Sequence, residues 1–116
     1  MVAIDEEGGD VSRLHQRDGS PFPGNAVLGR IDDVEATRAV GHAVGTQLAD
    51  VGIHLTLAPD VDVNSNPDNP VIGVRSFGAD PVAVADPFAA QLEIGPSSAA
   101  HIDDGRLPAD DLGDHL

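Results

Sequence analysis

The sequence contains no cysteine, lysine, tryptophan or tyrosine among its 116 residues. Without cysteine it can form no disulfide, no thiolate metal site and no thiol nucleophile. Its six basic residues are all arginine, and they stand against twenty Asp and Glu, which gives a formal net charge of −14. Nucleic acids and anionic membranes are bound through clustered Lys and Arg, so this charge argues against both as partners.

Long apolar runs are also missing. No run approaches the roughly 20 residues that span a bilayer, and the first residues, MVAIDEEGG, carry no secretory signal, so the chain as written is expected to be cytoplasmic. Domains seldom begin inside a strand, so we also expect the N-terminus to be truncated. Only three aromatic residues are present, which leaves Ala, Val, Leu and Ile to form the core.

The first half of the sequence alternates strand and helix signals. A short apolar run at 1–4 predicts a buried strand, and the glycines and prolines of 18–25 predict a loop. From Ile31 apolar residues recur at helical spacing, with Asp32 or Asp33 as the N-cap and Gly52 as the end. Alternation over 53–59 predicts a second strand. Strand, helix and strand in this order predict an α/β fold with a parallel sheet.

The second half is less regular. A polar loop with two Asn-Pro steps occupies 60–70, and an Ala-rich stretch over 79–92 predicts a helix that contains Pro87. Beyond it the sequence is acidic, with few apolar residues, which is typical of disorder. Ligands of parallel α/β sheets collect at the carboxyl ends of the strands. The acidic segments 5–7 and 60–62 are both expected there.

Three segments are candidates for a binding site, and each has a purely structural alternative. Residues 4–14 place carboxylates beside two glycines, which suits a polar ligand but also describes an ordinary acidic turn. Residues 60–64 begin like a calcium loop, but Ser65 and Val71 stand where such a loop needs Gly and Glu, so strand capping is favoured. Residues 69–78 contain a single arginine, Arg75, whose partner is either a ligand or an internal carboxylate such as Asp5 or Asp62.

Other catalytic patterns are absent from the sequence. The five histidines show no His-x-x-x-His spacing, no serine lies in Gly-x-Ser-x-Gly, and no glycine-rich phosphate loop precedes a helix. We therefore expect no bound metal and no cofactor.

Three segments in register resemble the N-terminal barrel domain of glycoside hydrolase family 3, in particular its bacterial β-N-acetylglucosaminidase or β-N-acetylhexosaminidase branch. They are IDEEGGDVSRL at 4–14, GIHLTLAPDVDVN at 52–64 and NPDNPVIGVRSFG at 66–78. The resemblance implies that residues 1–88 are a fragment of an incomplete (β/α)₈ TIM barrel, from about its second strand to the region after its third. It leaves 89–116 as an unmatched acidic tail that is expected to be disordered.

The resemblance also implies a function. It places Asp5, Arg13 and Arg75 at positions that bind the non-reducing sugar, in a glycosidase that acts on N-acetylglucosamine-containing glycans such as peptidoglycan fragments. Asp10 stands where the family usually has a basic residue. The family's lysine-histidine pair, its acid/base loop and its aspartate nucleophile have no counterpart, so no catalytic residue is assigned and the chain alone is expected to be inactive. A non-catalytic sugar-binding or acidic interaction module, and a non-functional gene fragment, remain as alternatives.

Overall fold

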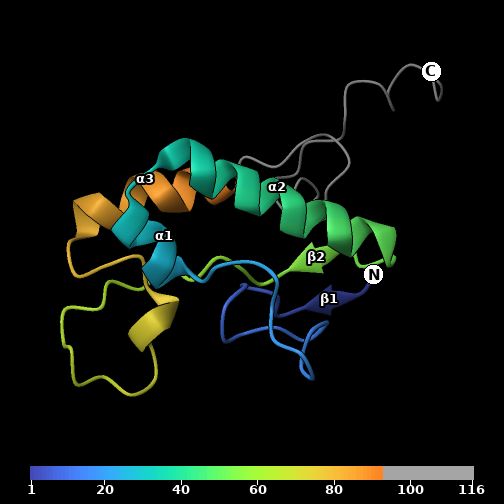
Figure 1. Ribbon diagram of the computed structural model, residues 1–116, viewed down its shortest axis with the longest axis horizontal. Coiled ribbons are helices and arrows are strands. Elements are labelled where there is room, and N and C mark those ends of the chain that lie inside the picture. The colour runs from blue at the N-terminus through green and yellow to red at the C-terminus, as the bar shows by residue number, and fades with distance from the viewer. Residues whose placement is uncertain (93–116) are drawn as a thin grey trace.

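The computed structural model describes residues 1–92 of the chain as a small α/β unit (Figure 1). The expected tail at 89–116 overlaps the last turn of a helix at 89–92, and the rest of it lies outside the described residues. Along the chain the elements are β1 (Ala3–Ile4), α1 (Asn25–Ile31), α2 (Val34–Asp50), β2 (Leu55–Thr56), the 3₁₀ helix η1 (Gly73–Arg75) and α3 (Pro81–Leu92). No helix within these residues is long and apolar enough to cross a membrane.

The two strands pair in parallel, as the sequence predicts. Ala3 lies opposite Leu55 and Ile4 opposite Thr56. The backbone N–H of Leu57 donates to the carbonyl of Ile4 at 2.9 Å, which carries the pairing one residue past β2. The second strand is shorter than the predicted 53–59, and Pro59 has no N–H with which to continue the ladder.

The helix α2 confirms the predicted crossover between the strands. Asp33 is its N-cap: one carboxylate oxygen accepts from the backbone N–H of Glu35 at 2.9 Å and of Ala36 at 3.1 Å. After Asp50 the chain turns at Gly52, whose φ of 76° is in the left-handed region that glycine tolerates best. The helix therefore begins at an acidic cap and ends before a glycine.

The helix α1 is not predicted by the sequence pattern. It has seven residues, and the prolines and glycines just before it mark that region as a loop. The helix forms because Leu28 buries its side chain against Phe77 and Val84, so tertiary packing overrides a weak local signal. A second group, Val44 and Leu48 of α2, packs with Val40 of the same helix. It also packs against residues in and around the strands and the loop after β1, namely Ile4, Leu14, Phe22 and Ile53.

Two glycines permit close backbone contacts between the helices and their neighbours. A Cβ at Gly41 of α2 would lie 2.4 Å from the carbonyl oxygen of Gln91 in α3, and a Cβ at Gly29 of α1 would lie 1.8 Å from that of Phe77. Helix α2 packs along α3, as Figure 1 shows.

Candidate functional site

The segments that follow β1 and β2 meet through the side chain of Arg75. Its Nε donates to Oε2 of Glu7 at 3.0 Å and its Nη2 donates to Oε1 of Glu7 at 2.8 Å. Glu7 follows β1 and Arg75 lies in η1, 68 residues further along the chain. The hydrogen bond with Glu7 raises the pKa of Arg75, and burial opposes this only in part. The result is a two-point ion pair between the two loops.

Asn25, the first residue of α1, holds the backbone beneath this ion pair. Its Nδ2 donates to the carbonyl of Arg75 at 2.7 Å and to the carbonyl of Asp60 at 3.3 Å. Only 2% of Asn25 is exposed. One amide thus ties α1, the segment after β2 and η1 together. The sequence pattern predicts no site role for Asn25, and it marks Glu7 only as part of the acidic segment expected at the strand ends.

Asp5 and Arg13, two of the predicted sugar-binding residues, lie together. Nη2 of Arg13 is 3.7 Å from Oδ2 of Asp5, and the side chains are 54% and 43% exposed. Both groups therefore keep donors and acceptors open to solvent. An exposed ion pair at this distance contributes about 0–1 kcal/mol to stability. That contribution is too small to explain why the two charged residues are placed together.

Glu6, between Asp5 and Glu7, shapes the loop from inside. It is 1% exposed, and its Oε2 accepts from the backbone N–H groups of Arg13 at 2.8 Å and Leu14 at 3.1 Å. The hydroxyl of Thr56 in β2 donates to the backbone carbonyl of Glu6 and accepts from its N–H, both at 3.3 Å. These contacts fix the backbone of Arg13 relative to β2 and leave its side chain free to reach outward.

Asp60 and Asp62 are two further carboxylates close to Arg75. Oδ2 of Asp60 is 3.8 Å from Nη2 of Arg75, and Oδ1 of Asp60 accepts from the backbone N–H of Asp62 at 2.9 Å. The neighbouring Asp60 carboxylate raises the pKa of Asp62, first through a shared hydrogen bond and then through charge repulsion. No group of three or more acidic or histidine side chains within residues 1–92 is arranged to hold a metal ion.

Arg75 has an internal carboxylate partner, as the structural alternative proposed, but the partner is Glu7. From the sequence, Asp5 or Asp62 is expected in this role. Both of those residues belong to the expected segments, yet Glu7 alone makes the two-point contact, and Asp60 is the next acidic neighbour. The side chain of Arg75 nevertheless stays 32% exposed, so the pairing does not remove it from solvent.

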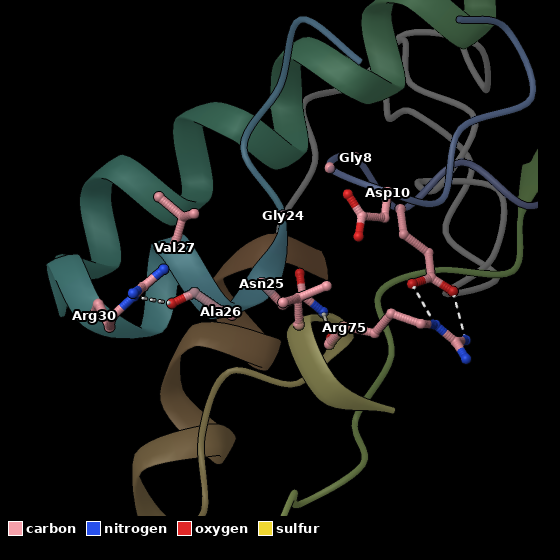
Figure 2. Close-up of a pocket in the computed structure, with 11 residues that line it drawn as sticks. Gly8, Asp10, Gly24, Asn25, Ala26, Val27, Arg30 and Arg75 are labelled. Carbon is pink, nitrogen blue, oxygen red and sulfur yellow. Dashed lines mark hydrogen bonds and ion pairs between the residues drawn. The ribbon is translucent and has the colours of Figure 1, made fainter. Parts of the chain in front are cut away.

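A pocket of about 160 Å³ lies beside the ion pair. Figure 2 shows it between Gly8 and Asp10 of the loop after β1, the start of α1, and η1. Arg75 lines this pocket, whereas Arg13 lines a second, more open hollow of about 370 Å³. Gly9 and Asp10 belong to the walls of both. The two predicted arginines thus lie in adjacent hollows, and Asp10 brings a negative charge to the boundary between them.

Comparison with known proteins identifies the class. The model of the glycosyl hydrolase family 3 N-terminal domain matches residues 1–92. Beta-hexosaminidase A of Pseudoalteromonas piscicida is 44% identical over 97 residues, which is 80% of this chain and 16% of that protein. Beta-hexosaminidase LpqI of Mycobacterium tuberculosis is 43% identical over 83 residues, or 72% of this chain and 21% of that protein.

Solved structures of family 3 enzymes also superpose on this chain. A glycoside hydrolase family 3 β-N-acetylglucosaminidase from Paenibacillus sp. FPU-7 superposes with a TM-score of 0.76 at 37% identity, over 90% of this chain and 19% of that one. The structure of M. tuberculosis LpqI gives a TM-score of 0.70 at 40% identity, over 79% of this chain and 27% of that one. The chain belongs to glycoside hydrolase family 3, and the matched residues 1–92 correspond to part of the family's N-terminal domain. It spans about a fifth of the length of the curated relatives named above.

Proposed function

We propose that this chain is the sugar-binding part of a β-N-acetylhexosaminidase-type glycoside hydrolase that acts on N-acetylglucosamine-containing glycans such as peptidoglycan fragments. The match of residues 1–92 to the family's N-terminal domain carries the proposal. Relatives named beta-hexosaminidase at 43–44% identity favour this specificity within the family. In the whole enzyme these residues would form part of a (β/α)₈ barrel, from about its second strand to the region after its third.

The proposed sugar ligands are Asp5, Arg13 and Arg75. A guanidinium offers five N–H donors and a carboxylate offers only acceptors, so the three groups complement hydroxyls that both donate and accept. Asp5 and Arg13 are about half exposed and follow β1, where ligands of parallel sheets bind. Arg75 is held at the edge of the neighbouring pocket.

We further propose that the 116-residue chain alone does not hydrolyse glycosides. Glycoside hydrolysis in most families uses two carboxyl groups on either side of the scissile bond. Three of the carboxylates near the strand ends are buried: Glu6 accepts from the backbone of the loop, Glu7 pairs with Arg75, and Asp60 lies 3.8 Å from Arg75. By family resemblance, neither the aspartate nucleophile nor the acid/base loop has a counterpart in this sequence, so no carboxyl group of the chain is assigned either catalytic role.

Calorimetric titration with N-acetylglucosamine tests the binding. The exposed Arg13 is the residue to change, because removing Arg75 would leave the buried Glu7 unpaired. We expect Arg13→Ala to weaken binding by tenfold or more, since a hydrogen bond from a charged group contributes about 1.5–3 kcal/mol. Arg17→Ala removes the same charge from an exposed position of the same loop and should leave the affinity unchanged.

Two results would contradict the proposal: no binding by the unaltered chain, or equal affinities of the Arg13 and Arg17 variants. The catalytic part is tested by incubating the chain with 4-nitrophenyl N-acetyl-β-D-glucosaminide. We expect no release of 4-nitrophenol above that of buffer, and sustained turnover would overturn the claim that the chain lacks a catalytic pair.

A further inference from the structure

Glu7 and Arg75 are joined more tightly than any other ion pair near the strand ends. Both Oε atoms of Glu7 are used, at 3.0 and 2.8 Å, and the side chain of Glu7 is 6% exposed. Figure 2 shows the two dashed contacts running from the guanidinium of Arg75. A two-point pair of this kind fixes the plane of the guanidinium as well as its position.

The pair leaves part of the guanidinium unoccupied. Glu7 takes the Nε–H and one N–H of Nη2, and Oδ2 of Asp60 lies 3.8 Å from the same Nη2, so the two N–H donors of Nη1 remain. The side chain of Arg75 is 32% exposed, so the ion pair does not remove it from solvent. The backbone of Arg75 is fixed separately, by the 2.7 Å bond from Asn25 to its carbonyl.

We propose that Glu7 is a positioning residue, which holds Arg75 so that its remaining N–H donors face a saccharide hydroxyl. This inference rests on the proposed function. An unrestrained arginine loses rotamer freedom when it binds a ligand, and that loss weakens affinity. In this chain the two-point contact with Glu7 restricts the rotamers of Arg75 before any sugar binds. Glu7 does not itself touch the sugar in this account, because both its oxygens are occupied.

Two variants of Glu7 test whether this residue positions the side chain of Arg75 or only balances its charge. Glu7→Gln keeps the length but sets an amide N–H against the donors of Arg75, and Glu7→Asp keeps the charge but shortens the side chain by one methylene. Both should lose the two-point contact, and each should weaken N-acetylglucosamine binding by about tenfold in calorimetric titration. The exposed Glu35→Gln is the matched control and should bind as the unaltered chain does.

A spectroscopic readout on the unaltered chain keeps the test independent of variant folding. The Nε–Hε signal of Arg75 in a ¹H–¹⁵N spectrum should exchange with water far more slowly than that of the exposed Arg17. Equally fast exchange would overturn the positioning role. So would Glu7→Asp binding as tightly as the unaltered chain. Absence of binding by the unaltered chain would instead refute the proposed function on which this inference rests.

Discussion

Replacing Gly41 with alanine tests how closely α2 approaches α3. Alanine is favoured over glycine inside a helix by about 0.8–1.0 kcal/mol, so helix propensity alone predicts a more stable protein. The structure predicts the opposite. A Cβ at this position would lie 2.4 Å from the carbonyl oxygen of Gln91 and 3.1 Å from its carbonyl carbon and Cα. These are backbone atoms, which cannot turn aside as a flexible side chain could.

The size of the effect follows from that separation. Favourable contacts between non-bonded heavy atoms lie at about 3.5–4.0 Å, so the two helices would have to separate by about 1 Å. Overpacking of this kind costs about 1–3 kcal/mol. Subtracting the gain in propensity leaves a net loss of up to about 2 kcal/mol for Gly41→Ala.

Thermal unfolding followed by far-ultraviolet circular dichroism measures this loss. In a domain of this size 1 kcal/mol shifts Tm by about 4–8 °C, so Tm should fall, by up to about 16 °C. Ala39→Gly, at an exposed position of the same helix, calibrates the propensity term. A Gly41→Ala variant with a higher Tm than the unaltered chain would show that α2 and α3 are not packed at this distance.

Three further predictions concern the same fold. Asp33→Ala removes a carboxylate that accepts two backbone N–H groups at the start of α2 and should cost about 1 kcal/mol in urea unfolding; an unchanged midpoint would refute the cap. Leu48→Ala opens a cavity at a side chain with 0% exposure and should cost about 2–5 kcal/mol in the same assay; a loss below 1 kcal/mol would place Leu48 outside the core. Asp62→Asn removes a carboxyl group whose raised pKa favours the protonated form in the folded state, so stability from this group is lost as pH rises through that pKa. The variant should therefore have the higher Tm at neutral pH, and the difference should vanish in acid; a lower Tm at neutral pH would contradict this.

The sequence predicts the crossover well because its signals are local. Asp33, the helical spacing of Val44 and Leu48, and Gly52 mark α2 from end to end, and the structure confirms each of them. Parallel pairing of the two strands follows from their order along the chain. Helix α1 is different. Its residues lie just after a cluster of turn formers, and its main stabilisation comes from the burial of Leu28 against distant residues.

The sequence predicts only part of the site. The acidic segments after β1 and β2 could be placed at one edge of the sheet, since parallel strands end there together. The partner of Arg75 could not be chosen from the sequence, because Asp5, Glu7, Asp60 and Asp62 are all acidic and all near the strand ends. Which of them is buried and faces η1 depends on side-chain direction, and that is fixed by tertiary packing.

Chemical-shift mapping of the ¹⁵N-labelled chain during titration with N-acetylglucosamine locates the sugar site residue by residue. We expect the backbone amides of Asp5, Arg13 and Arg75 to shift with a common saturation curve, while those of the exposed face of α2, such as Ala39 and Ala49, stay unchanged. Saturable shifts confined to other surfaces, or no shifts at all, would contradict the assignment of a sugar site to the carboxyl ends of β1 and β2.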